Sequence, residues 1–155
     1  MAIGTDIERY LEVASRLEGP LDVTRLEGQR REHGLIRGAL GLSPMKVSQC
    51  GICGKAFPSA LLVAGHIKKR SECTSVEKMD IANVAMAFCV FGCDALFERR
   101  YIKVVERNIH VVLTGIPVID EYLDELKGVE APGWSAGREQ YFAWHANQPL
   151  TKFHA

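Results

Sequence analysis

Two closely spaced cysteine pairs constrain this sequence more than any other feature. Cys50 and Cys53 are separated by two residues, and Cys89 and Cys93 are separated by three. The first residues do not form a basic segment followed by an apolar one, so we expect no signal peptide and a cytoplasmic location. In a reducing compartment, cysteines that come in pairs usually bind a metal ion instead of forming disulfides.

A structural zinc ion is the metal that this spacing favours. Two thiolates that lie two residues apart on a tight turn can bind one zinc ion together, so Cys50 and Cys53 predict a zinc knuckle. Cys89 and Cys93 can complete a tetrahedral site, and their longer spacing is compatible with a turn that enters a helix. Because four cysteine ligands leave no open position for substrate, the zinc would be structural. Two alternatives stay open: Cys89 and Cys93 are simply small buried residues, or Cys73 replaces one of the ligands.

The composition describes one globular chain without a membrane segment. Of its 155 residues, 47% are hydrophobic and 25% are charged, which describes a globular chain and argues against disorder. The 19 basic and 19 acidic residues give a net charge of zero, so a polybasic tail is excluded while a local basic patch is not. The apolar runs are too short to span a membrane.

Hydrophobic periodicity divides the chain into an N-terminal helical segment, residues 1–45, and a main domain, residues 46–155, which together form one compact unit. We expect helices over residues 5–17 and 23–40 in the first part. In the main domain the pattern predicts a strand over 60–67, a loop over 68–79, a short helix that starts at Asp80 and contains Asn83 and Met86, a helix from Asp94, a hairpin of residues 101–105 and 109–113, and helices after Pro117 and over 136–147.

A set of polar residues between and after the cysteine pairs carries a resemblance to a known family. His66 follows Ala-Gly at the end of the predicted strand, Asn83 lies in the middle, and Asp94 opens the motif Asp-Ala-Leu-Phe-Glu, which ends at Glu98. In order and spacing, residues 50–105 resemble the HNH endonucleases, closest to their restriction-type branch. The resemblance implies an α+β fold with a ββα-metal core, in which two strands and a helix surround one metal ion. A structural zinc knuckle and helices on both flanks complete the expected fold.

The resemblance also implies a role for each of these residues. His66 would be the general base that takes a proton from the attacking water, and imidazole titrates in the neutral range that this step needs. Asn83 would hold the loop that carries His66. Asp94 occupies the metal-binding position of the third motif, where many relatives have histidine, and Glu98 occupies its acidic position. Because a helix places residues four apart on one face, these two carboxylates could share a hard cation such as Mg²⁺ or Mn²⁺.

Basic residues lie next to the predicted catalytic ones. Lys68, Lys69 and Arg70 directly follow the predicted base, and Arg99 and Arg100 follow the predicted metal-binding helix. Such clusters can hold the phosphates of a nucleic acid, although a run of charge alone is more often a solvated loop. The remaining histidines have no partners at ligand spacing, and we interpret them as structural or surface residues: His33, His110, His145 and His154.

Together these patterns predict a metal-dependent HNH endonuclease that hydrolyses phosphodiester bonds in DNA, of restriction or defence type. The main alternative is a catalytically inactive, zinc-stabilised DNA-binding module. It is favoured by the carboxylate at Asp94 and by Gly65, which stands where many relatives have a metal ligand. A nuclease for RNA or structured DNA and a protein-interaction domain with a zinc knuckle are weaker candidates. Because the chain has little room for a separate reader domain, it could bind a short symmetric DNA site as a homodimer.

Overall fold

The structure is a computed structural model that describes residues 7–9, 11–12 and 20–150. The chain divides into two compact units, residues 1–35 and residues 36–155. The first predicted helix lies mostly outside the described residues, although residues 7–9 and 11–12 are helical. Among the residues that the structure describes, no helix is long and apolar enough to cross a membrane.

Helix α2 (Pro20–Ala39) agrees with the second predicted helix. Proline at its start costs no hydrogen bond, because the first amide of a helix has no acceptor within the helix. The helix ends before Gly41, whose φ of +72° lies in the left-handed region that favours glycine. At this end the Arg37 guanidinium donates hydrogen bonds to the carbonyls of Ser59 and Leu62, at 2.8 and 2.7 Å. These bonds fasten the last turn of α2 to the segment that enters the next strand.

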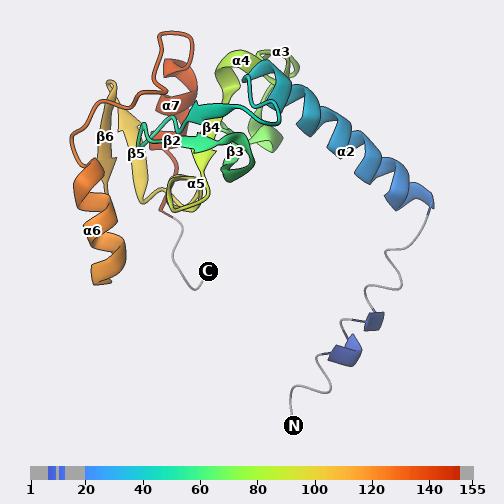
Figure 1. The fold of residues 1–155 in the computed structure, drawn as a ribbon, viewed down its shortest axis with the longest axis horizontal. Coiled ribbons are helices and arrows are strands. Elements are labelled where there is room, and N and C mark those ends of the chain that lie inside the picture. The colour runs from blue at the N-terminus through green and yellow to red at the C-terminus, as the bar shows by residue number, and fades with distance from the viewer. Residues whose placement is uncertain (1–6, 10, 13–19, 151–155) are drawn as a thin grey trace. The chain divides into compact units, whose positions relative to one another are not determined.

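Three two-stranded antiparallel sheets follow α2 (Figure 1). They pair β1 (Val47–Gln49) with β2 (Ala56–Pro58), β3 (Leu62–His66) with β4 (Ala85–Cys89), and β5 (Ile102–Val105) with β6 (Asn108–Val111). The β5–β6 hairpin confirms the hairpin that the sequence predicts, and β3 confirms the predicted strand in a shorter form.

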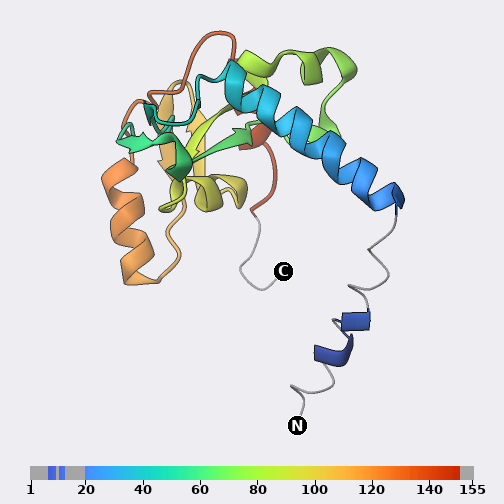
Figure 2. The same cartoon turned by 45° about the vertical axis from the view of Figure 1, so that its right-hand side comes forward.

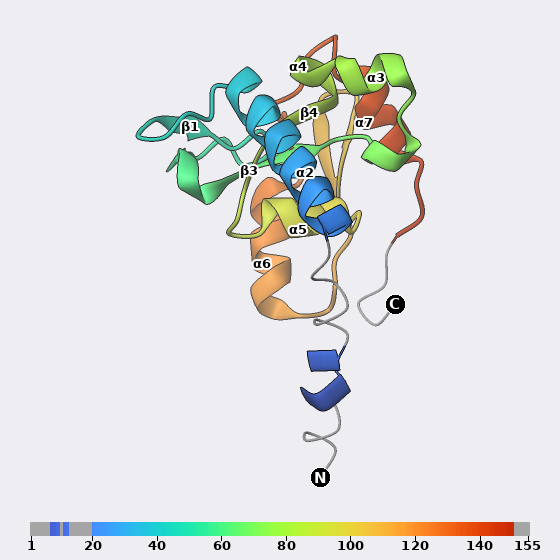
Figure 3. The ribbon, with the colours of Figure 1, turned by 90° about the vertical axis from the view of Figure 1, so that its right-hand side faces the viewer.

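Short helices connect and cover these strands. They are two 3₁₀ turns, η1 (Ser59–Leu61) and η2 (Arg70–Glu72), and the α-helices α3 (Ser75–Met79), α4 (Ile81–Val84), α5 (Cys93–Glu98), α6 (Pro117–Leu126) and α7 (Glu139–Ala146). Helix α6 lies beside the β5–β6 hairpin (Figure 2). Helix α7 lies beside α3 and α4, where the Tyr141 hydroxyl donates a hydrogen bond to Asp80 at 2.6 Å (Figure 3). The fold is therefore a small mixed α+β fold, as predicted.

Strands β3 and β4 and helix α5 form the centre of this fold. The register places Leu62 opposite Cys89 and His66 opposite Ala85. The start of β3 therefore lies beside the second cysteine pair, and its far end carries the histidine. Helix α5 begins at Cys93, so one short turn connects the end of β4 to the start of this helix.

Aromatic rings fill the core beneath α5. The ring of Phe97 lies 4.9 Å from that of Phe88 and 6.1 Å from that of Phe142, measured between centroids. Phe142 and Tyr141 are fully buried on α7, which packs on β5. The closing helix that the sequence predicts thus covers the core with two buried aromatic side chains.

Helix α5 ends in a Schellman motif whose left-handed residue is Arg100, with a φ of +67°. The Tyr101 amide donates to the Leu96 carbonyl at 2.9 Å, and the Arg100 amide donates to the Phe97 carbonyl at 3.0 Å. Glycine is the usual residue at this position, because a side chain strains the left-handed backbone. The Arg100 side chain adds a bond of its own, from Nη1 to the Glu98 carbonyl at 2.7 Å.

Two details of the sequence-based assignment are wrong. Residues 68–79 are not a plain loop, because they contain η2 and α3. Thr74 and Glu77 start α3 with a capping box: the Glu77 amide donates to the Thr74 hydroxyl at 3.2 Å, and the Thr74 amide donates to the Glu77 carboxylate at 2.9 Å. Met86 lies on β4 and not on the short helix, because pairing with β3 prevails over weak local helical periodicity.

Candidate metal centre and adjoining cavity

The four paired cysteines converge on one point. The sulfur atoms of Cys50, Cys53, Cys89 and Cys93 all lie within 4.8 Å of one another, and none forms a disulfide. A tetrahedral zinc ion bound at about 2.3 Å holds its sulfur ligands about 3.8 Å apart, so the group has the dimensions of such a site. The predicted grouping is confirmed, and its donor set, four sulfurs, fits structural zinc.

The local backbone explains why the first pair forms a knuckle. The Gly54 amide donates to the Cys50 carbonyl at 3.0 Å, and Gly54 has the φ of +71° that such a turn requires. The amides of Ile52 and Cys89 both donate to the Cys50 sulfur, at 3.4 and 3.3 Å. Donors of this kind stabilise the thiolate form that binds metal. The Cys89 amide thus links the knuckle directly to β4.

A glycine lets the knuckle approach β4 closely. The Gly51 amide donates to the Ala87 carbonyl at 2.8 Å. A Cβ atom on Gly51 would lie only 2.7 Å from the Met86 sulfur, so no larger residue fits there without a shift. The knuckle is therefore held against β4 by a backbone bond in a space that only glycine leaves open.

Ionisation of one sulfur of Cys50, Cys89 and Cys93 opposes ionisation of the others. Hydrogen bonds from Cys50 and Cys93 hold the pKa of Cys89 well below its usual range. The bond with Cys89 raises the pKa of Cys50 to about 11, and bonds with Cys50 and Cys89 raise that of Cys93. One thiolate therefore suppresses ionisation of its neighbours. A divalent cation removes this suppression, because it attracts every thiolate at once.

Cys73 is not part of this group. Its sulfur lies 3.6 Å from the Lys68 carbonyl and 3.4 Å from the Lys69 carbonyl, in the loop after β3. Burial raises the pKa of its thiol. The alternative in which Cys73 replaces a zinc ligand therefore has no support in the geometry.

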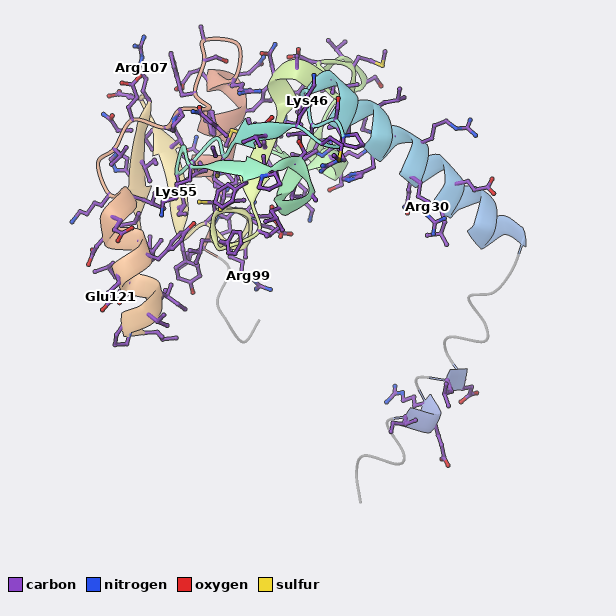
Figure 4. The ribbon with its side chains drawn as sticks, in the orientation of Figure 1. Arg30, Lys46, Lys55, Arg99, Arg107 and Glu121 are labelled. Atoms are coloured by element: carbon purple, nitrogen blue, oxygen red, sulfur yellow. The ribbon has the colours of Figure 1, made fainter. Side chains whose placement is uncertain are left out.

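A cavity of about 570 Å³ adjoins the centre on the side of α5. Its walls come from β3, from the loop after β3, from β4, α5 and α7. Seven of the residues that the sequence predicts to be functional line it: His66, Lys69, Arg70, Asp94, Glu98, Arg99 and Arg100. Figure 4 shows Arg99 extending outward from α5. Acidic and cationic side chains thus share one concave space.

Asp94 is the half-buried carboxylate of this cavity. Burial is the main cause that raises its pKa, and the neighbouring charges of Glu98 and Cys89 raise it further. Ionised Asp94 is therefore unfavourable in the folded chain unless a cation or a hydrogen-bond donor approaches it. Within the described ranges, the four cysteines are the only group of three or more His, Cys, Asp or Glu side chains close enough to hold a metal ion. A second cation at Asp94 and Glu98 stays a prediction.

Gly65 has a physical reason to be glycine. A Cβ atom at this position would lie 2.7 Å from the Phe88 ring, and 3.6 Å from the Asp94 carboxylate. The Phe88 ring thus fills the space into which a side chain at position 65 would extend. A side chain at this position would require the Phe88 ring to shift, so the packing of the aromatic core favours glycine here.

Two predicted site residues do not line the cavity. The Asn83 amide donates to the Asp80 carboxylate at 2.9 Å. Its helix nevertheless reaches the residue after His66, because the Ile67 amide donates to the Val84 carbonyl at 2.7 Å. Lys68 forms a salt bridge with Glu77 at 2.9 Å and lies 5.8 Å from the centroid of the Trp144 ring. Lys68 is therefore engaged within the fold instead of facing the cavity.

Sequence reasoning assigned His145 no part in the site, yet it lines the cavity. Its ring stacks on Phe97 at 3.7 Å between centroids, and its Nε2 donates to the Phe97 carbonyl at 2.7 Å. Burial lowers its pKa to about 4, so the imidazole is neutral near neutral pH. Its structural interpretation fits this geometry, since the bond fixes α7 to the C-terminal end of α5.

Tyr122 is the second residue that sequence reasoning missed. Its hydroxyl lies 2.9 Å from the Cys93 sulfur and 3.6 Å from the Cys89 sulfur. Helical periodicity assigns Tyr122 to the buried face of α6, but no sequence signal connects that face to cysteines about thirty residues earlier in the chain.

The fold and the donor set define a small α+β protein with a candidate four-cysteine metal centre. No protein-family model matches the chain, and no curated protein matches its sequence.

Replacing Cys50 by Ser should release the metal and destabilise the fold severely. Structural zinc contributes folding free energy directly, on the order of 10 kcal/mol in small zinc peptides. Zinc content by elemental analysis and urea unfolding check this. Cys73→Ser is the matched control and should keep the full zinc content. A well-folded wild-type preparation that contains no zinc would contradict the assignment.

Gly65→Ala should lower the free energy of unfolding by about 1–3 kcal/mol, the usual cost of overpacking a core. The cause is the contact with the Phe88 ring, so Phe88→Leu in the same chain should remove part of the added cost. Urea unfolding of both single variants and the double variant measures this coupling. Strictly additive free energies would show that Phe88 is not the obstacle.

Proposed function

We propose that the chain is a metal-dependent endonuclease of the HNH type that hydrolyses phosphodiester bonds in DNA. The observation that carries the proposal is the set of side chains that share the 570 Å³ cavity: His66, the carboxylates of Asp94 and Glu98, and four cationic side chains. Phosphodiester hydrolysis needs these groups, namely a base, oxygen ligands for a hard cation, and cations that hold phosphates.

The order of the elements around the cavity supports the same proposal. The antiparallel pair β3–β4 is followed directly by helix α5. His66 ends the first strand, and Asp94 lies in the first turn of the helix. The ββα-metal unit implied by the resemblance has the same order of strands, helix and chemical groups.

In the proposed reaction, His66 accepts a proton from the attacking water. Asp94 and Glu98 would hold Mg²⁺ or Mn²⁺, and such an ion would supply stabilisation of negative charge on the phosphoryl group and the leaving 3′ oxygen. The charge of Glu98 raises the proton affinity of Asp94, and a cation that binds both carboxylates would remove this repulsion. The cationic side chains of the cavity hold the flanking phosphates: Lys69, Arg70, Arg99 and Arg100.

The zinc ion has a separate, structural role in this proposal. Cys89 and Cys93 stand at the two ends of the turn between β4 and α5. A metal ion bound to both, and to the knuckle, would fix the direction in which α5 leaves the sheet. Asp94 follows Cys93 directly, so the same turn sets the position of the carboxylate.

Purified protein should nick supercoiled plasmid DNA in Mg²⁺ or Mn²⁺, and EDTA should abolish nicking. His66→Ala should lower the rate about a hundredfold or more with DNA affinity almost unchanged, because a general base acts in the transition state. His110→Ala, at an exposed position on β6, is the matched control and should nick normally. Salt-dependent DNA retention without any nicking would favour the inactive DNA-binding module instead.

Asp94→Asn should abolish most activity in Mg²⁺ without loss of stability at neutral pH. Burial and Glu98 raise the pKa of Asp94 in the folded state, so the folded state binds a proton more tightly than the unfolded chain. The ionised carboxylate therefore subtracts stability above the raised pKa, and the neutral amide removes that penalty. The stability advantage of the variant should shrink as the pH falls below the raised pKa, and it should vanish below the ordinary pKa of an aspartate.

Nicking rates and urea unfolding at several pH values measure both effects. Asp124→Asn, at an exposed position on α6, is the control and should change neither quantity. Normal nicking by Asp94→Asn would remove this carboxylate from the proposed mechanism.

A further inference from the structure

We propose that Tyr122 is a positioning residue of the metal centre, whose hydroxyl donates a hydrogen bond to the Cys93 thiolate and makes metal affinity depend on helix α6. This inference rests on the proposed binding of zinc by the four cysteines. The hydroxyl lies 2.9 Å from the Cys93 sulfur, within reach of a strong hydrogen bond, and 3.6 Å from the Cys89 sulfur, at the edge of that reach.

Two features of the fold bring this hydroxyl to the sulfurs. The Asp120 carboxylate accepts the Thr114 amide at 2.7 Å and the Gly115 amide at 2.9 Å, which fixes the first turn of α6. At the ring itself, a Cβ atom on Gly92 would lie 3.0 Å from Cζ of Tyr122. The turn between Cys89 and Cys93 thus has a glycine where the tyrosine ring approaches it.

The charge of the centre explains why a donor is needed there. Four thiolates and one divalent cation leave a net charge of about −2, and a buried charge is costly unless hydrogen-bond donors surround it. Two backbone amides, those of Ile52 and Cys89, donate to the Cys50 sulfur. On the α5 side of the centre, the Cys93 sulfur receives the Tyr122 hydroxyl instead. A phenol is protonated at neutral pH, so it can only donate to a thiolate.

The donors on the two sides therefore differ in kind. The amides at Cys50 belong to the knuckle and to β4, which the Gly51 amide joins to each other, so they are present whenever the knuckle folds. The donor at Cys93 is a side chain from a separate helix, so it strengthens metal binding only when α6 is docked. Removing one such outer hydrogen bond typically weakens metal affinity about 10- to 100-fold.

The test compares zinc affinity in Tyr122→Phe and wild type, by competition with a chromophoric chelator at fixed pH. We expect Tyr122→Phe to bind zinc about 10- to 100-fold more weakly. Tyr141→Phe is the matched control, because it removes a buried tyrosine hydroxyl whose partner is Asp80, away from the cysteines. Tyr141→Phe should keep the zinc affinity of wild type even where it lowers stability.

A spectroscopic measurement separates this role from packing. In the cobalt-substituted protein, loss of the hydrogen bond should move the sulfur-to-cobalt charge-transfer band of Tyr122→Phe to longer wavelength, because the thiolate becomes a better electron donor. Replacement of Tyr122 by 3-fluorotyrosine makes the hydroxyl a stronger donor at almost the same size, and should move the band the opposite way. This second variant keeps the test decisive if Tyr122→Phe folds poorly.

Wild-type affinity and an unshifted cobalt spectrum in both variants would overturn the role of Tyr122 while leaving the metal centre intact. Failure of the wild-type protein to bind zinc or cobalt would instead remove the metal centre, and this inference with it.

Discussion

The rest of the structure depends on the meeting of four sulfur atoms that come from three separate elements. The knuckle after β1, the last residue of β4 and the first residue of α5 share one point, where the sulfurs lie within 4.8 Å of one another. Such closeness is unfavourable for thiolates alone and favourable around a divalent cation. Two of these sulfurs bracket the short turn between β4 and α5, so their meeting point lies next to the start of the helix that carries Asp94 and Glu98.

The cavity itself combines opposite demands on stability. Part of its wall is the aromatic core, because Phe88 and Phe97 belong to the core and also line the cavity. The rest of its wall carries charged side chains, which would be unfavourable inside a core. Asp94 is half-buried next to another carboxylate, which raises its pKa, and cationic side chains stand around the same space. Charged groups that destabilise the fold while the site is empty, and no longer do so once a ligand is bound, are typical of functional sites.

Much of this could be predicted from residues that are close in the sequence. Cysteine spacing predicts the group of four sulfurs that could hold a metal ion, and the order of His66, Asp94 and Glu98 predicts side chains that do share a cavity. The capping box of α3 is also encoded locally, in the spacing of Thr74 and Glu77. What could not be predicted depends on contacts between distant segments. The partner of Tyr122 and the ring beside Gly65 are set by how the elements pack, and no local spacing encodes them.

The left-handed backbone of Arg100 has a consequence for engineering this protein. A non-glycine residue in this conformation gives up roughly 1–2 kcal/mol, and its side chain lines the cavity. A library selected for thermal tolerance alone should therefore accumulate glycine at this position. Each such clone would lack the Arg100 guanidinium that lines the cavity. Thermal stability and the positive charge of the cavity should therefore change in opposite directions at position 100. A useful selection has to measure both stability and ligand binding in the same clones.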